Sequence, residues 1–232
     1  MAEMTVQGRV PLMRLIVIPS LIALAVTLFR LTGELLHWSP RWFYNDAGGI
    51  TPSGVSWIVG IVWLPVPFGI YFAMRLIAAG RGPARAIRAI LYSVGGLLVL
   101  YLGQRLVVSS LNLGLRASLL LIWAFSAVPA VLMIRAWPAL WRVLLAYGLA
   151  SRIPVVVIMF LAMRGLWGTH YDYAGQLPLD DFGFYYVWLA FIPQLVFWVG
   201  FTILLGMLAG AITAAVYRRQ LRTNPAMLNA TG

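Results

Sequence analysis

The chain has 232 residues, of which 62% are hydrophobic and only 10% are charged, whereas a soluble domain carries roughly 25% charged residues. This composition excludes a soluble globular protein, and the absence of cysteine excludes disulfides, thiolate metal sites and a cysteine nucleophile. The formal net charge of +11 does not indicate nucleic-acid binding, because the arginines lie at the ends of apolar runs rather than along one stripe. We therefore expect residues 1–232 to form a single integral membrane domain, an all-α polytopic helical bundle in contact with the lipid bilayer.

Six apolar segments are long enough to cross the hydrocarbon core as helices, which takes about 20 residues. They cover residues 10–31, 54–77, 87–108, 115–134, 139–164 and 185–216. We therefore predict a bundle of about six transmembrane helices. The last segment is the longest, and we expect it to tilt or to extend past the membrane interface.

The distribution of arginine predicts the orientation of the bundle. With the N-terminus inside, the cytoplasmic arginines are Arg9, Arg14, Arg75, Arg81, Arg85, Arg88, Arg135, Arg142, Arg218, Arg219 and Arg222, against Arg30, Arg41, Arg105, Arg116 and Arg164 outside. Because short cytoplasmic loops carry the excess of positive residues, this bias predicts that both termini are cytoplasmic. We expect the membrane to be a bacterial cytoplasmic membrane.

Two long polar segments separate the spans on the predicted outer side, at residues 34–53 and 166–186. Both combine aromatic residues with glycine and proline, which favours ordered turns on the membrane surface over a disordered tether. Exposed aromatic side chains would otherwise form a large apolar patch. We therefore expect the two loops to pack against each other as a cap over the helix ends.

Both histidines and most of the acidic residues fall in these two loops. They form a candidate extracytoplasmic polar cluster of Glu34, His37, Asp46, His170, Asp172, Asp180 and Asp181. The spacing predicts that Glu34 and His37 share a face of a helix end, and that His170 and Asp172 share one side of an extended segment. Three interpretations stay open: ordinary turn and cap residues, a recognition surface, or a metal or proton site. His37, His170 and Asp172 are the weak metal candidates, and no spacing matches a named metal motif.

Arg152 lies near the middle of the fifth predicted span, two residues before Pro154. An arginine at membrane depth costs roughly 2.5–3.5 kcal/mol on insertion scales, so it normally faces a cavity or a partner and marks a functional site. The candidate partners are Gln194, Gln104, tyrosines, backbone carbonyls freed by the proline, or a bound anion. The alternative is that the span begins near Ser151 and that Arg152 extends to the cytoplasmic interface.

Helix-breaking and small residues inside the spans allow two interpretations each. Pro65 and Pro67 in the second span and Pro193 in the sixth are typical of the broken helices that line binding sites in transporters, but proline is also tolerated in membrane helices. Gly206 and Gly210 have the spacing that lets two helices approach closely. Their partner is either another helix of the same chain or a second copy in a homo-oligomer.

Three functions remain open at this stage. We favour transport or the binding of a small anionic or lipid-like ligand within the bundle, because prolines and an arginine lie inside the spans. In size and number of spans the chain is similar to the substrate-binding components of vitamin transporters, although no motif supports that similarity. The alternatives are a non-catalytic subunit or scaffold of a larger membrane complex, and a metal-assisted enzyme acting at the outer face. No catalytic motif favours the enzyme, and the residues indicate no cofactor.

Overall fold

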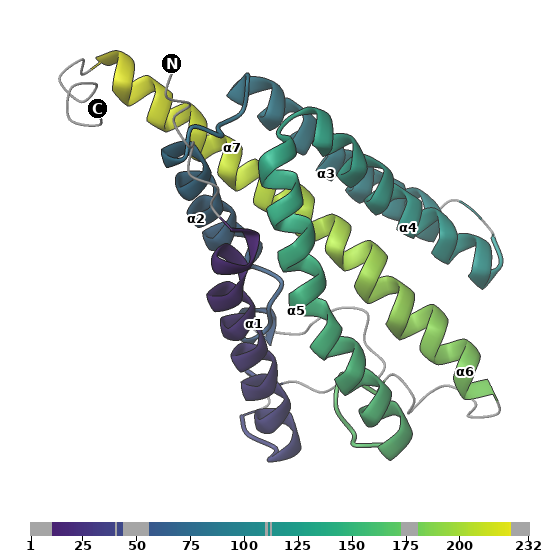
Figure 1. The fold of residues 1–232 in the computed structure, drawn as a ribbon. Helices are drawn as coiled ribbons and strands as arrows, with labels where there is room; N and C mark the ends of the chain where they lie inside the picture. The colour runs from purple at the N-terminus through teal and green to yellow at the C-terminus, as the bar shows by residue number, and fades with distance from the viewer. Residues whose placement is uncertain are drawn as a thin grey trace, which may run out of the picture.

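The structure is a computed structural model that describes residues 11–39, 41–43, 56–109, 111, 113–172 and 181–223. These residues form an all-α bundle (Figure 1), with no strand in the described ranges, so the predicted fold class is confirmed. The α-helices are α1 (Leu12–Leu35), α2 (Pro65–Ala78), α3 (Ala86–Ser109), α4 (Leu115–Leu132), α5 (Pro138–Gly165), α6 (Phe182–Tyr185) and α7 (Val199–Thr223). Two 3₁₀ turns, η1 (Ser56–Val59) and η2 (Met133–Arg135), and two π-helical stretches, η5 (Tyr186–Phe191) and η6 (Pro193–Trp198), complete the described elements.

Five helical segments are long and apolar enough to cross a membrane, as expected for a multi-pass integral membrane protein. They are Leu12–Leu35, Ala86–Ser109, Leu115–Arg135, Pro138–Gly165 and the continuous path Phe182–Gln220. Many of their large apolar side chains are exposed on the outside of the bundle, where lipid is the complementary environment.

The predicted second span, 54–77, is not one continuous helix. The structure has the η1 turn and a run of bends, and α2 begins only at Pro65. Proline lacks a backbone N–H donor and has a fixed φ, so it is well suited to the first turn of a helix, where that donor has no partner anyway. The 14 residues of α2 span about 21 Å at about 1.5 Å per residue, which is less than the hydrocarbon core of about 30 Å.

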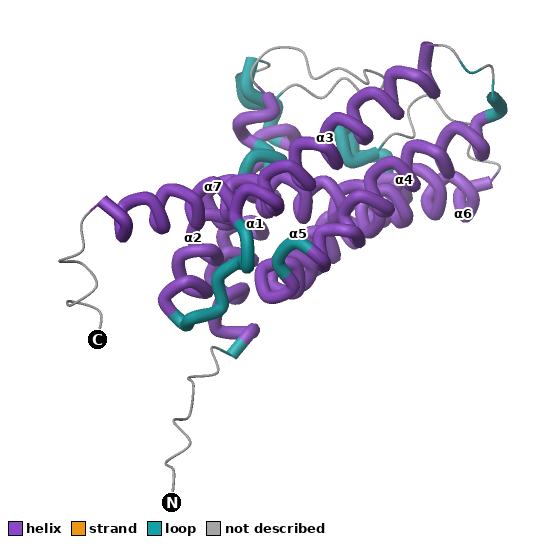
Figure 2. The backbone as a smooth tube through the Cα atoms, turned by 90° about the horizontal axis from the view of Figure 1, so that it is seen from above, coloured by secondary structure: helices purple, strands orange, loops and turns teal. Residues whose placement is uncertain are grey.

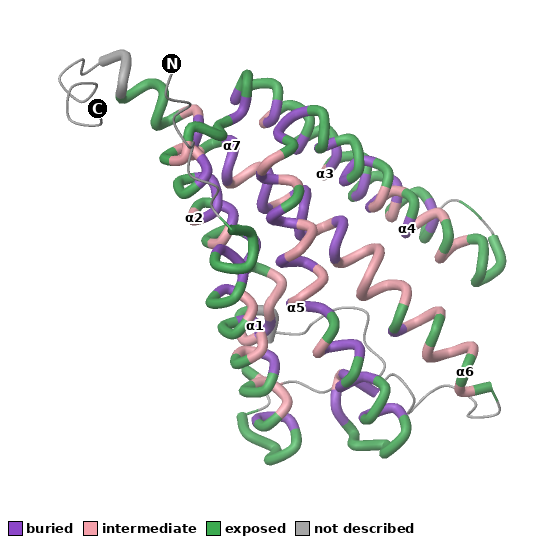
Figure 3. The backbone as a smooth tube through the Cα atoms, in the orientation of Figure 1, coloured by how far each residue is buried: buried purple, intermediate pink, exposed green. Residues whose placement is uncertain are grey.

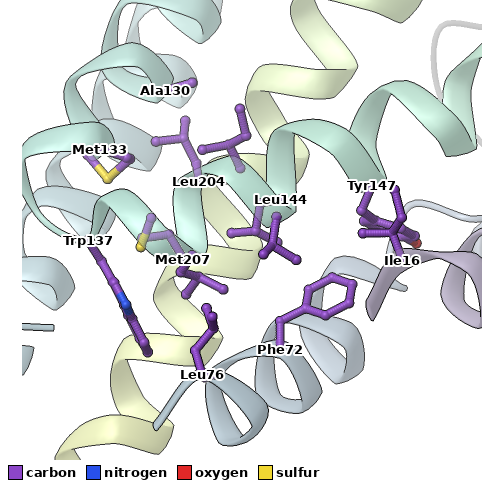
Figure 4. Packing of buried hydrophobic residues seen from close by; sticks show 14 of the residues in the cluster. Ile16, Phe72, Leu76, Ala130, Met133, Trp137, Leu144, Tyr147, Leu204 and Met207 are labelled. Carbon is purple, nitrogen blue, oxygen red and sulfur yellow. The ribbon is translucent and has the colours of Figure 1, made fainter. Parts of the chain in front are cut away.

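The α7 helix is the centre of the bundle. It packs against α2, α3, α4 and α5, whereas α1 packs against α5. Figure 1 shows α7 running diagonally between the α3–α4 pair and the α1–α2 side, and Figure 2 shows its C-terminal turns projecting past the other helices. The core consists of apolar side chains from facing helices, such as Phe72, Leu144, Leu204 and Met207 (Figure 4). Buried positions concentrate in α5 and α7, while the outer faces of α1, α3 and α4 are exposed (Figure 3).

Glycines set the distance between α2 and α7. A Cβ atom added at Gly69 would lie only 2.4 Å from the carbonyl oxygen of Gly206. One added at Gly210 would meet Leu140 at 2.6 Å and the carbonyl oxygen of Gly69 at 3.1 Å. Gly206 and Gly210 are buried. The two glycines therefore serve packing within the chain, the intramolecular one of the two predicted alternatives, because small residues let helix backbones approach closely.

The two ends of the bundle differ in charge. The helices from α1 to α5 and the continuous path from α6 to α7 alternate in direction. The C-terminal ends of α2, α4 and α7 therefore lie together with the N-terminal ends of α3 and α5 (Figure 1). The described arginines of this basic end are Arg75, Arg81, Arg85, Arg88, Arg135, Arg142, Arg218 and Arg219. Trp137 Nε1 donates to the Arg81 carbonyl at 2.8 Å, and Arg218 donates to the carbonyls of Pro83 and Ala84, so the loop before α3 is fixed to α5 and α7.

Candidate functional site: a buried arginine and a polar cap

Arg152 lies near the middle of α5, which is one continuous helix of 28 residues. The helix is continuous on both sides of Ser151, and the alternative of a membrane span that begins near Ser151 stays a prediction. The side chain is only 6% exposed. Its Nη1 atom donates to Gln194 Oε1 at 3.1 Å, and its guanidinium carbon lies 4.8 Å from the ring centroid of Trp198. Arg152 is thus held inside the bundle by a hydrogen bond and a cation–π contact.

Both partners of Arg152 lie on the π-helical stretch η6. Gln194 and Trp198 are four residues apart there, so they reach the same side of the helix. The stretch begins at Pro193, and a proline inside a helix removes a hydrogen bond and crowds the carbonyl four residues earlier. The chain stays helical through Pro193 but with wider turns, so the expected break takes the form of π geometry. Single π turns inside α-helices are frequent at functional sites.

No carboxylate neutralises Arg152 in the described part of the chain. The only ion pairs found there are those of Glu34 with Arg30 and His170. A guanidinium has five N–H donors, and Gln194 accepts one of them. Within the described ranges, the contacts of the guanidinium are therefore the Gln194 amide oxygen and the Trp198 ring, both of them neutral.

Gln104, the other predicted amide partner, is half-buried on α3. That helix packs on α4 and α7, and no contact between Gln104 and Arg152 occurs within the described ranges. Gln194 is the better candidate because its helix crosses directly over the middle of α5. Its amide nitrogen lies 3.5 Å from Met159 Sδ, which orients the carbonyl oxygen toward Arg152.

A second polar group joins the end of α1 to the segment after α5. Glu34 is 1% exposed and accepts from Arg30 Nε at 2.8 Å and from the backbone N–H of His170 at 3.0 Å. The Nδ1 atom of His170 lies 2.7 Å from the same carboxylate. A buried carboxylate needs such donors, because an unpaired buried charge is very costly. Glu34 is therefore the anchor that binds the loop to α1.

Asp172 shapes the loop that Glu34 holds. Its carboxylate accepts from the backbone N–H groups of Gly168 and Thr169, at 2.7 and 2.5 Å, and from Thr169 Oγ1 at 2.9 Å. These bonds close a turn, so His170 and Asp172 do not lie side by side on an extended segment as the spacing predicted. Asp172 is 3% exposed, and its oxygens are occupied by the local backbone.

Tyr171 connects this loop with the interior. It is 5% exposed, donates to the Thr27 carbonyl at 3.3 Å and packs with Val155 and Met159, which lie on α5 within two turns of Arg152. Burial raises the pKa of Tyr171, so its hydroxyl stays neutral. Residues 168–172, which we name the outer cap after the predicted outer side, therefore pack on α5 within two turns of Arg152.

Burial also lowers the pKa of His170 from its ordinary value. The hydrogen bond to Glu34 opposes this shift, and the charge of Arg30 adds to it. The neutral imidazole donates from Nδ1 to the carboxylate, and the side chain keeps 30% of its surface exposed. His170 therefore sits in the outer cap as a neutral donor with one ring edge open.

The other members of the predicted polar cluster are distributed differently. His37 follows the end of α1, is exposed and has a φ of 51°, so it does not share a helix face with the buried Glu34. Asp181 caps α6 by accepting from the backbone N–H of Phe184 at 3.1 Å. Asp46 and Asp180 lie outside the described residues. Within the described ranges, no group of three or more His, Asp or Glu side chains is placed to hold a metal ion.

Two residues of these sites, and one pairing between predicted residues, were not predicted. Trp198 and Arg30 each stand four residues from a predicted residue on the same helix, and that spacing is a usable signal. The pairing of Glu34 with His170 joins positions 136 residues apart, and no local pattern indicates it.

Comparison with protein-family models, with curated proteins and with solved structures finds no match for this chain.

Proposed function

We propose that this protein binds a small anionic ligand inside the membrane, with Arg152 as the residue that recognises the anion, and that it acts in transport or ligand binding. The observation that carries the proposal is the position of Arg152, which is buried near the middle of α5 and has neutral partners among the described residues. A cation held in the bilayer without a carboxylate is stabilised most by an anionic ligand, and a guanidinium can bind a carboxylate or phosphate with two parallel hydrogen bonds.

The surroundings of Arg152 support this function. Gln194 and Trp198 hold the guanidinium in place from a helix with π geometry, and interrupted helices near the membrane midplane are typical of transporter binding sites. The outer cap packs on α5 within two turns of Arg152. We further propose that the chain is a single domain in a bacterial cytoplasmic membrane, with the basic end and both termini in the cytoplasm.

Thermal unfolding of the purified protein in lipid nanodiscs tests the proposal. The probes are acetate, hexanoate and inorganic phosphate at constant ionic strength, with hexanamide as the neutral analogue of hexanoate. The variants are Arg152→Gln and, as a control on the same helix, Arg164→Gln, whose exposed guanidinium lies over the rings of Phe160 and Phe182.

We expect at least one of the anions to raise the unfolding temperature of the wild type and of Arg164→Gln, because a ligand that binds only the folded state stabilises it. Arg152→Gln should show no such shift, and hexanamide should have no effect on any of the three proteins. An equal shift in Arg152→Gln would contradict the proposal. Absence of any shift, together with co-purification of other membrane subunits, would favour the alternative of a non-catalytic subunit.

A further inference from the structure

An apolar groove runs between α3 and α4 on the outside of the bundle. Its volume is about 610 Å³, within the range of roughly 300–1,000 Å³ that small-molecule sites occupy. The lining is almost entirely apolar, with Leu91, Gly95, Gly96 and Val99 from α3 and Phe125, Val128, Pro129 and Leu132 from α4. Several of these side chains are exposed. The groove therefore opens toward the lipid rather than into the bundle.

Two consecutive glycines form the α3 side of the groove, and only one of them is required by the packing of the chain. A Cβ atom at Gly96 would meet Leu204 at 2.7 Å and Pro129 at 3.1 Å. A Cβ atom at Gly95 would meet nothing within 4 Å. Glycine weakens a helix interior, and no atom of the described residues uses the space that Gly95 leaves open. That space is available to an occupant from outside the chain.

The groove ends at the basic end of the bundle. Arg135 lines it there, and Arg88 donates from Nη2 to the hydroxyl of Tyr92, another lining residue, at 3.0 Å. Both arginines are exposed. The acidic residues that the structure describes lie at other helix ends: Glu34 in the last turn of α1, Asp172 after α5 and Asp181 before α6. These helix ends are opposite the basic end (Figure 1). An apolar channel with a cationic mouth and no acidic neighbour in the described ranges is complementary to an anionic amphiphile.

We infer that this groove binds an anionic phospholipid, with an acyl chain along Gly95 and the phosphate at Arg135 and Arg88. Basic sites between transmembrane helices recognise anionic headgroups, and guanidinium groups bind phosphate with more than one hydrogen bond. The zwitterionic headgroup of phosphatidylcholine carries its own cation and gains less from the two arginines. This site is separate from Arg152, which faces the interior on α5.

Native mass spectrometry of the delipidated protein in detergent tests the inference. Dioleoyl phosphatidylglycerol and dioleoyl phosphatidylcholine are titrated separately, and the first bound lipid is quantified. Arg135→Gln removes one of the two arginines at the mouth. Arg105→Gln is its control, because Arg105 is an exposed arginine at the other end of α3. Gly95→Phe fills the groove, and Ala117→Phe is its control, because Ala117 is exposed on α4 outside the groove.

We expect Arg135→Gln to bind phosphatidylglycerol about fivefold more weakly than the wild type, since one arginine near a headgroup contributes about a fivefold factor in affinity. Arg135→Gln should not change the binding of phosphatidylcholine, and Arg105→Gln should change neither lipid. Gly95→Phe should reduce the binding of both lipids, whereas Ala117→Phe should not.

Equal phosphatidylglycerol affinity in wild type and Arg135→Gln would overturn the inference. So would a correctly folded Gly95→Phe variant with unchanged lipid binding. A wild-type dimer that Gly95→Phe converts to a monomer, with lipid binding unaltered, would assign the groove to a second copy instead. If Gly95→Phe fails to fold, the comparison of Arg135→Gln with Arg105→Gln still decides.

Discussion

The fold itself does not explain why Arg152 is buried, because burying a charged guanidinium costs folding free energy. Its contacts with Gln194 and Trp198 satisfy only part of the guanidinium, and replacing a buried charge with an apolar side chain of similar volume is often neutral or stabilising. A residue that costs stability and yet has oriented partners has the character of a binding residue. Of the two amides that the sequence offered as partners, Gln194 and Gln104, the structure pairs Arg152 with Gln194. The depth of Arg152 in the membrane stays a prediction.

A double-variant cycle measures how Arg152 and Gln194 depend on each other. Arg152→Met leaves the Gln194 carbonyl oxygen without its donor, and an unsatisfied buried acceptor costs about 1–3 kcal/mol. Arg152→Met/Gln194→Met removes both polar groups, so we expect it to unfold at a higher temperature than Arg152→Met alone. Thermal unfolding in nanodiscs without added anions measures the coupling between the two side chains in the folded protein. Strictly additive effects of the two substitutions would refute the contact.

His170 gives the stability of the outer cap a pH dependence. Its pKa is lowered by burial in the folded protein, with Glu34, Arg30 and Asp172 as the charged groups around it. The unfolded chain then binds a proton more readily than the folded chain, so stability should fall as the pH is lowered from about 7.5 through the ordinary histidine pKa of about 6.5. Thermal unfolding of wild type and His170→Gln across this range should show a steeper loss in the wild type. Identical slopes would contradict the assignment.

At the scale of elements, the packing of α2 on α7 depends on Gly69. An added methyl group would meet the backbone of Gly206, which cannot move aside as a flexible side chain can, so we expect Gly69→Ala to be destabilising by about 1–3 kcal/mol, as overpacking typically is. Gly95→Ala is the matched control, because it meets nothing within 4 Å and should gain up to about 1 kcal/mol in helix propensity. If the unfolding free energy changes in the same direction in both variants, the close contact is disproved.

Some elements could be predicted from the sequence and others could not. The spans α1, α3, α4 and α5 follow from length and hydropathy, because a helix in lipid satisfies its own backbone hydrogen bonds. The late start of α2 at Pro65 did not follow, because an apolar run of the right length conceals whether its first residues are helical. Nor did the π turns around Pro193, since they depend on how the chain relieves the proline against neighbouring helices.

The same contrast applies to the candidate site as a whole. Local spacing placed Glu34 with His37, whereas the fold pairs Glu34 with His170 and leaves His37 exposed. The end of α1 and the segment after α5 are separated by four helices along the chain and meet only after the bundle has formed. A helix can end at Leu35 and bury the residue before it, so helical periodicity near a helix end is a weak guide to which side chains meet.

At the scale of the whole molecule, the difference in charge between the two ends predicts the orientation of the protein in the membrane. Because the chain has no cysteine, a maleimide can label only the cysteine that is introduced. Ser39 and Gly82 are both exposed. Ser39 follows the C-terminal end of α1, whereas Gly82 lies between α2 and α3 at the basic end. We expect a membrane-impermeant maleimide to label Ser39→Cys in intact cells and Gly82→Cys only after the membrane is opened. The reverse pattern, or labelling of both positions from outside, would reject the cytoplasmic assignment of the basic end.

The most direct measurement of the central claim is the affinity of the protein for hexanoate, by isothermal titration calorimetry in nanodiscs at constant ionic strength. Hydrogen bonds to a charged group contribute about 1.5–3 kcal/mol, so we predict that Arg152→Gln binds about 10- to 100-fold more weakly than the wild type. Arg152→Lys should lie between them, because an ammonium group cannot form the bidentate pair. The same dissociation constant in the wild type and in Arg152→Gln would contradict an anion site at Arg152.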